Sequence, residues 1–378
     1  MKNLDEKTRR LILIFAIIIV FILLLFLIFF IIGKLRNGSL SYDEIEEKML
    51  VSAKKYYSDN NTLLPEADND SSEVDANVLS SGGYMKDLNS YVKKKNVKCS
   101  GKVIVTKSGD KYNYVPVLDC GKSYKTNSLY DMLINSVVDS GDGLYQFNQY
   151  YDGGEGVAYV YRGEYPKNYI SINKTLWRIV KINTDGTINI VQSNDDPKKN
   201  DYYYWDNKYN IKTNTYEGIN DFNVSRIKRK LELYYENDTF IPTEYKSILL
   251  PRKVCIGGRS IKDTVNNGKI ECSKISDVKM FYSILQTNDF INASLDKNCK
   301  RIEDASCSNF NYLTKFGKTW WFITVNSKSY NKGYAADGIA YRRILSYQAS
   351  IRVSTNLNKN VVYSSGTGTK ADPYIIKK

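Results

Sequence analysis

The most restrictive chemical feature of this 378-residue chain is that it contains no histidine. Histidine is the usual general base of serine and cysteine hydrolases and a common ligand of zinc, copper and haem iron. Sites that need an imidazole are therefore excluded. Mechanisms that use two carboxylates, or a serine with a lysine, remain open.

Carboxylates are thus the main residues left for acid–base chemistry. Asp195, Asp196 and Asp201 stand in a polar, turn-rich stretch beside a group of aromatic residues. They indicate, as an alternative function, a carboxylate-dependent enzyme that acts on cell-wall polymers or glycans. Solvated loop residues are the simpler interpretation of this stretch, so we assign no catalytic residue and expect no enzyme activity.

Metal and cofactor motifs are weak throughout the chain. Asp139-Ser-Gly-Asp-Gly143 resembles the start of a calcium loop, but glycine occupies the third and fifth ligand positions. The glycines of Ser365-Gly-Thr-Gly-Thr369 are not followed by the lysine of a phosphate-binding loop. We expect neither a metal nor a cofactor.

Aromatic residues are the better candidates for ligand contact. The chain has 32 tyrosines, 13 phenylalanines and 4 tryptophans, and tyrosine excess is typical of contact surfaces, although a biased genome would produce it too. The candidate binding residues are Tyr203, Tyr204, Trp205 and Tyr209, followed near the end of the chain by Trp320 and Trp321. Their rings could stack on sugars or on a protein partner, whereas partial burial against a sheet is the alternative.

The net charge of +13 predicts attraction to polyanions. Outside a membrane these are anionic wall polymers, lipid headgroups and acidic glycans, and we expect no nucleic acid partner. The alternative is an ordinary solvated face of lysines, because no run of five or six like charges concentrates the positive charge.

The chain has six cysteines, an even number, and none of them forms a C-x-x-C motif. Structural disulfides in an oxidising compartment are therefore the economical interpretation, with fifteen pairings open in principle. Alternating residues on both sides of Gly109-Asp110 predict a β-hairpin. If Ser108 lies opposite Lys111, Cys99 lies opposite Cys120, within disulfide reach.

In the same register, the backbone N–H that Pro116 lacks would point away from the partner strand. No further strand can pair there, so the strand of Pro116 should be an edge strand. For the other four cysteines we predict pairing between neighbours in the sequence. This gives Cys255 with Cys272 and Cys299 with Cys307.

An apolar segment without charges or hydroxyl groups runs from Leu11 to Ile32, long enough to cross a bilayer as one helix. Basic residues precede it and acidic residues follow, so residues 1–10 are expected in the cytoplasm and the bulk outside the cell. A cleaved signal peptide is the alternative, but Gly33-Lys-Leu-Arg36 offers no cleavage site of small residues. We predict a single-pass cell-membrane protein that contacts the lipid bilayer through residues 11–32.

Beyond this segment the patterns predict an α+β protein. Residues 33–120 form a small membrane-proximal module with a helix from Tyr42, capped by Ser41 and Glu44, and the disulfide-closed hairpin. Residues 121–156 form a connector. Residues 157–378 form a larger β-rich domain, in which strands are expected at 157–162, 169–172, 176–182, 188–191, 320–325, 338–341, 350–354 and 361–363, and a helix capped by Asn223.

Several landmarks in the second half resemble those of a group of uncharacterised single-pass bacterial cell-surface proteins. They are Gly143-Leu-Tyr145, Tyr161-Arg-Gly163, Leu176-Trp-Arg-Ile-Val-Lys-Ile-Asn-Thr-Asp-Gly186, Asn292-Ala-Ser-Leu295, Asn311-Tyr-Leu313, Trp320-Trp321, Ser350-Ile-Arg352 and Gly366-Thr-Gly-Thr-Lys-Ala-Asp-Pro-Tyr374. The last third also resembles C-type-lectin-like domains of the formylglycine-generating-enzyme type. The helix and hairpin of the first module are similar to a pilin in outline, without the pilin leader site or the glutamate of its membrane segment.

These resemblances imply an extracellular module and no catalytic residue. Together with the charge and the aromatic residues, they predict a membrane-anchored binding or structural protein of the bacterial envelope. Its expected ligand is a glycan, an anionic wall polymer or a surface protein. A signal transducer is disfavoured, because ten cytoplasmic residues are too few for an output domain.

Overall fold

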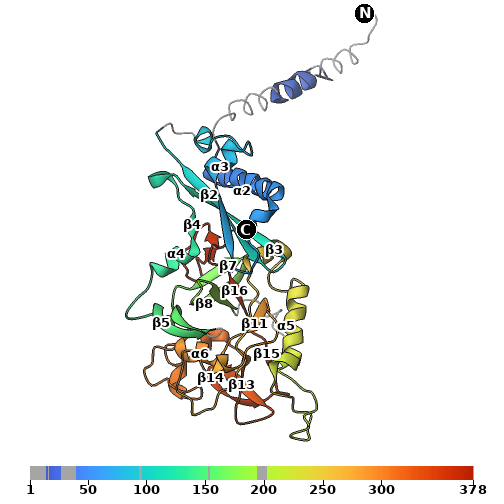
Figure 1. Ribbon diagram of the computed structural model, residues 1–378, viewed down its shortest axis with the longest axis vertical. Coiled ribbons are helices and arrows are strands. Elements are labelled where there is room, and N and C mark those ends of the chain that lie inside the picture. Colours follow the sequence, from blue (N-terminus) through green and yellow to red (C-terminus); the bar gives the residue numbers. More distant parts are fainter. Residues whose placement is uncertain are drawn as a thin grey trace, which may run out of the picture. The chain divides into compact units, whose positions relative to one another are not determined.

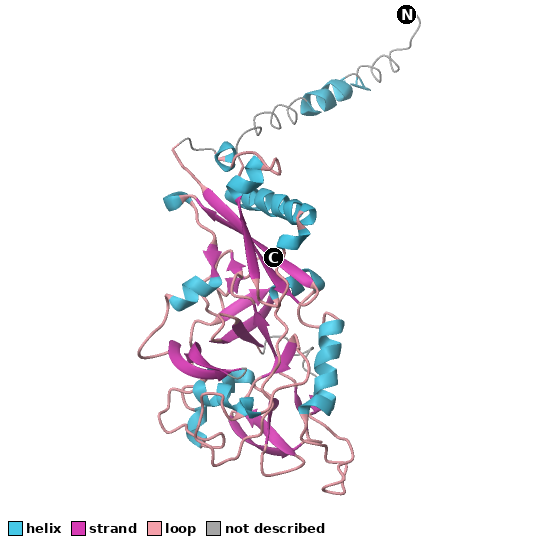
Figure 2. Cartoon of the chain, viewed as in Figure 1, coloured by secondary structure: helices cyan, strands magenta, loops and turns pink. Residues whose placement is uncertain are grey.

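The structure is a computed structural model that describes residues 14–15, 17–26, 40–92, 96–151, 154–193 and 202–377 (Figure 1). These residues form a mixed α+β protein rich in strands (Figure 2). They group into two compact units. The smaller one comprises residues up to Thr62, Glu73–Val103 and Pro116–Thr126, and the larger one comprises Leu63–Ser72, Ile104–Val115 and the chain from Asn127 onward.

Only part of the predicted membrane segment is described. Residues 14–15 and 17–26 are helical and their side chains are exposed. No helix within the described ranges is both long and apolar enough to span a bilayer. The rest of the 11–32 segment and the predicted cytoplasmic tail, residues 1–10, lie outside the described residues, so the membrane span stays a prediction.

The smaller unit is built around helix α2 (Tyr42–Asp59). The predicted capping box is confirmed, since Ser41 N–H donates to the Glu44 carboxylate at 2.8 Å and Glu44 N–H donates to Ser41 Oγ at 3.3 Å. Its apolar face, which includes Ile45, Met49 and Ala53, is fully buried. A Cβ on Gly101 would lie 2.6 Å from Met49 Cε, so glycine allows the close approach of helix to strand.

The predicted hairpin is also confirmed. A three-stranded sheet has the order β1 (Ser71–Asp75), β2 (Ser100–Ser108) and β3 (Lys111–Asp119), with the turn at Gly109-Asp110. Gly109 has a φ of 58°, a conformation that glycine adopts at little cost. Pro116 lies on β3, an edge strand as its missing N–H requires. The short helix α3 (Ala76–Ser81) follows β1 directly and packs against α2.

The larger unit contains an eight-stranded sheet in which four of the predicted strands occur close to their predicted bounds. Its path runs β11, β16, β9, β8, β6, β5, and β7 pairs with both β8 and β18. The strands are β5 (Gly143–Tyr151), β6 (Gly154–Arg162), β7 (Tyr169–Ile172), β8 (Thr175–Ile182), β9 (Ile188–Gln192), β11 (Tyr282–Ile284), β16 (Val353–Leu357) and β18 (Tyr374–Ile375). Residues 121–156, predicted to be a connector, supply β5, which pairs with β6 along its whole length.

A five-stranded sheet in the same unit has the order β10, β15, β12, β13, β14. Its strands are β10 (Tyr202–Tyr204), β12 (Trp320–Val325), β13 (Lys332–Asp337), β14 (Ile339–Ile344) and β15 (Gln348–Ser350). A two-stranded pair joins β4 (Asn127–Ser128) to β17 (Val362–Tyr363). The helices are α4 (Leu129–Ile134), α5 (Arg226–Glu236) and α6 (Thr287–Asn292), and α5 lies beside β11 (Figure 1).

The prediction of a helix capped by Asn223 was wrong by two residues. Residues Phe222–Val224 form a short 3₁₀ turn, and α5 starts at Arg226 with Ser225 as its cap. Ser225 Oγ accepts the backbone N–H of Lys228 at 3.2 Å. Serine caps the free N–H groups at the start of a helix as well as asparagine does.

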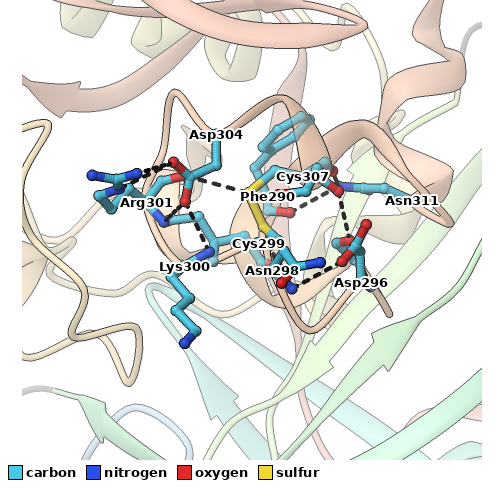
Figure 3. The surroundings of a disulfide bond; sticks show 12 residues. Phe290, Asp296, Asn298, Cys299, Lys300, Arg301, Asp304, Cys307 and Asn311 are labelled. Carbon is cyan, nitrogen blue, oxygen red and sulfur yellow. Dashed lines mark hydrogen bonds and ion pairs between the residues drawn. A yellow bond between two sulfur atoms is a disulfide. The ribbon is translucent and has the colours of Figure 1, made fainter.

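All three predicted disulfides are confirmed: Cys99–Cys120, Cys255–Cys272 and Cys299–Cys307. Figure 3 shows how hydrogen bonds reinforce the smallest loop. Asp304 accepts the backbone N–H groups of Lys300 and Arg301 inside that loop. Beside it, hydrogen bonds from Asn309 and from the Asn298 N–H hold the pKa of Asp296 below its usual value.

Candidate ligand-binding site

The first wall of the candidate site is the loop closed by Cys255–Cys272. Its backbone is fixed because Arg259 N–H donates to Val325 O at 2.9 Å and Ser327 N–H donates to Arg259 O at 3.0 Å. Within the loop, Arg259 and Glu271 form an ion pair with no exposed side-chain surface. The loop therefore presents Ser260, Ile261 and Lys262 from a rigid base.

The second wall is the turn between β12 and β13. Buried Asn326 organises it: its side-chain oxygen accepts Lys328 N–H at 2.8 Å, and its amide donates to Tyr334 Oη at 3.1 Å. Asn326 N–H also donates to Lys332 O at 3.0 Å, which closes the turn. Lys328 and Lys332 consequently leave the same turn with exposed side chains.

The third wall is Arg342 on the edge strand β14. Its Nε lies 2.8 Å from Glu303 Oε1, and Glu303 belongs to the loop closed by Cys299–Cys307. Two disulfide loops and one β-turn thus converge at the same place.

These walls enclose a hollow of about 400 Å³, which we call the basic hollow. It is lined by Ser260, Ile261, Lys262, Asn326, Lys328, Ser329, Lys332 and Arg342. Four of these residues carry a positive charge and none carries a negative charge. Within the described part of the chain, Lys262, Lys328 and Lys332 form no ion pair, so their charge is available to a ligand.

A second, smaller hollow shows the opposite arrangement. It measures about 250 Å³ and is lined by Asp68, Asn69, Asp185, Thr187, Leu250, Pro251, Arg252, Lys253 and Lys279. Here Arg252 pairs with Asp185 and Lys279 pairs with Asp68. Because Arg252 and Lys279 are neutralised by these carboxylates, this hollow is a weaker candidate for binding an anionic ligand. Because Asp68 and Asp185 are held by cations, it is also a weaker candidate for acid–base catalysis.

An aromatic surface adjoins the basic hollow. Ser329 lines the hollow, and the next residue, Tyr330, is 56% exposed. The loop 206–220 packs here, since Asn210 Nδ2 donates to Tyr330 O at 2.9 Å and Lys212 Nζ lies 4.4 Å from the centre of the Tyr330 ring.

The same loop carries two further exposed rings. Tyr209 and Tyr216 lie with ring centres 5.2 Å apart and are 45% and 75% exposed. We call Tyr209, Tyr216 and Tyr330 the tyrosine platform.

The structure separates the six residues predicted to bind a ligand into three groups by their exposure. Trp205, Trp320 and Trp321 are buried, and the indole N–H groups of Trp205 and Trp321 donate to the carbonyls of Phe322 and Tyr203, each at 3.0 Å. Tyr203 and Tyr204 lie half-buried on the edge strand β10, and Tyr209 is exposed on the platform. Ligand contact by these six residues stays a prediction. The exposed position of Tyr209 on the tyrosine platform favours it for that residue.

The candidate carboxylates Asp195, Asp196 and Asp201 lie outside the described residues. Among those described, no group of three cysteine, aspartate or glutamate side chains is placed to hold a metal ion. Buried carboxylates in the larger unit have structural partners: Asp289 lies 2.6 Å from Lys181, and Glu271 pairs with Arg259.

The cations of the basic hollow were missed in the sequence because they are distant along the chain. Lys262 and Arg342 come from a disulfide loop and a strand separated by the whole of β12 and β13. The run Asn326-Ser-Lys-Ser-Tyr-Asn-Lys332 between two strands was the only available signal, since its asparagines and serines are typical of a tight turn that presents its lysines.

No protein-family model matches the chain, and neither the curated proteins nor the solved structures gave a match. The resemblances to surface proteins, C-type-lectin-like domains and pilins therefore stay predictions.

Proposed function

We propose that this chain is a membrane-anchored, non-enzymatic protein of the bacterial cell envelope that binds an anionic envelope polymer. Residues 11–32 are the anchor, residues 1–10 lie in the cytoplasm, and the bulk lies outside the cell. The three disulfides support an oxidising location, because such bonds are rare in reducing compartments.

One observation carries the choice of ligand: three exposed lysines of the basic hollow have no carboxylate partner among the described residues. Like charges brought together repel one another, and an anion placed among them removes that repulsion. Arg342, whose charge is paired with Glu303, adds a planar donor group that Glu303 orients. A phosphate or carboxylate group repeated along a polymer suits this arrangement.

A binding measurement on the full-length chain in detergent tests the proposal. The probes are sodium polyphosphate, polygalacturonate and a neutral glucan, each at two salt concentrations. We expect the two anionic polymers to bind and the glucan to bind more weakly. Binding should weaken as salt rises, because the lysines are exposed to screening ions.

The matching variant replaces Lys262, Lys328 and Lys332 with glutamine. If each exposed charge contributes about 0.5 kcal/mol, the triple variant binds about tenfold more weakly and loses most of its salt dependence. A control triple variant at Lys122, Lys167 and Lys174, which are exposed and do not line the hollow, removes the same net charge. Equal losses in both variants, or no binding of either anionic polymer, would contradict the proposal.

The anchor and location are tested separately in native cells. Alkaline carbonate should leave the protein in the membrane fraction, and an added protease should digest it in intact cells. Mass spectrometry should find the six cysteines oxidised. Release by carbonate, or a mature chain that begins after Ile32, would contradict the anchor without affecting the ligand.

A further inference from the structure

The tyrosine platform beside the basic hollow gives the ligand a second chemical requirement. Ser329 lines the hollow and the exposed Tyr330 follows it directly in the chain, so a polymer that extends from the hollow past Ser329 would meet Tyr330. The platform would then contact the neighbouring part of the same polymer.

The rings of the tyrosine platform are exposed, although leaving apolar ring surface in water is unfavourable. Tyr216 and Tyr330 are 75% and 56% exposed, and Ile211, in the same loop as Tyr216, is 85% exposed. Apolar surface gathered on one loop marks a binding surface more often than isolated exposed residues do. Tyrosine also loses little conformational entropy when it is covered.

The loop is held rather than free, so the platform is largely pre-formed. Inside the loop, Asn210 Nδ2 donates to Gly218 O at 2.7 Å. From the β12–β13 turn, Asn331 Nδ2 donates to the carboxylate of Glu217 in the loop at 2.5 Å. Asn220 N–H donates to Tyr330 O at 3.2 Å. The turn that carries Lys328, Lys332 and Tyr330 is therefore tied to the loop that carries Tyr209 and Tyr216.

We infer that the ligand is an acidic polysaccharide, whose charged groups enter the basic hollow while a sugar ring packs on the tyrosine platform. This inference rests on the proposed function. A sugar ring has an apolar face of C–H groups that an aromatic ring can cover, whereas a polyphosphate chain has no such face. Lys212, over the ring of Tyr330, adds a positive charge at the junction of the two surfaces.

The decisive comparison uses the full-length chain with polygalacturonate and polyphosphate of matched charge. We expect polygalacturonate to bind about tenfold more tightly at equal charge concentration. Replacing both Tyr216 and Tyr330 with alanine should abolish this preference and leave polyphosphate binding unchanged. Replacing both with phenylalanine should retain it, since the ring remains.

Tyr165→Ala is the matched control, because that side chain is 73% exposed and does not belong to the platform. Thermal unfolding of each variant checks that the fold is intact. Equal binding of the two polymers, or no effect of the alanine pair, would overturn the inference and leave the proposed function standing. Tighter binding of a single-stranded oligonucleotide than of either polymer would contradict the proposed function as well. Failure of every polyanion to bind would overturn both.

Discussion

Arg259 and Glu271 form an ion pair in which neither side chain has exposed surface, with Arg259 Nε 2.8 Å from Glu271 Oε1. The guanidinium also donates to Val265 O at 2.7 Å, and Thr287 Oγ1 donates to the carboxylate at 2.7 Å. Such a network compensates part of the cost of removing two charges from water. It also fixes the backbone that presents Lys262.

Breaking this pair should strongly destabilise the larger unit. Glu271→Gln leaves the buried guanidinium without its counter-charge, and we expect a loss of about 3–5 kcal/mol in the free energy of unfolding. Urea unfolding measures it. The double variant Arg259→Met, Glu271→Leu should lose less than Glu271→Gln alone, because no unpaired charge is buried. A loss below about 1 kcal/mol for Glu271→Gln would show that water reaches the pair.

Removing the Cys255–Cys272 bridge should affect both stability and binding. The bridge joins residues 17 positions apart, so replacing both cysteines with serine should cost about 3 kcal/mol. It should also weaken polymer binding, since the released loop carries Lys262. The Cys99–Cys120 bridge, in the smaller unit, is the control: its loss should lower stability and leave binding unchanged. Equal binding defects would assign the effect to unfolding.

Trp205 is a core residue, and its replacement should report on stability. It has no exposed surface and packs against Phe222 with ring centres 6.2 Å apart. Trp205→Ala should lower the free energy of unfolding by about 3–5 kcal/mol, measured by thermal or urea denaturation. Tyr209→Ala, on the exposed platform, should change it by about 0.5 kcal/mol or less. A small loss for Trp205→Ala would place the indole at the surface.

Alkaline pH should destabilise the fold in part through Tyr235. Burial, with the charges of Asp110 and Asp238, raises the pKa of Tyr235 to about 12. An unfolded tyrosine ionises near pH 10, so the stabilising contribution of the neutral phenol is complete below about pH 10 and declines as the pH approaches 12. Unfolding free energies across this interval should fall less steeply for Tyr235→Phe. Identical slopes would mean that Tyr235 ionises equally easily in both states.

Local patterns predicted local structure well. The hairpin register followed from Gly109-Asp110 and two alternating strands, and it brought Cys99 and Cys120 together as expected. Short-range pairing also held for the other two bridges, because each closes a loop between neighbouring elements. These features depend on residues that lie close together along the chain.

Long-range features could not be predicted in the same way. Trp320 and Trp321 occupy adjacent positions on a strand and point to opposite faces, so one of them would usually be exposed. In β12, however, every residue is buried, since both faces of the sheet are covered. The same limit applies to the basic hollow, whose walls meet only after two sheets and two disulfide loops have formed.

The order of the cysteines along the chain has a consequence for biosynthesis. Each bridge joins a cysteine to the next one in the sequence, across 21, 17 and 8 positions. When the polypeptide emerges amino end first, the second cysteine of each pair appears before any cysteine that could compete for the first one. We therefore expect oxidation during emergence to give the correct connectivity without a disulfide isomerase, whereas refolding the complete reduced chain must choose among fifteen connectivities.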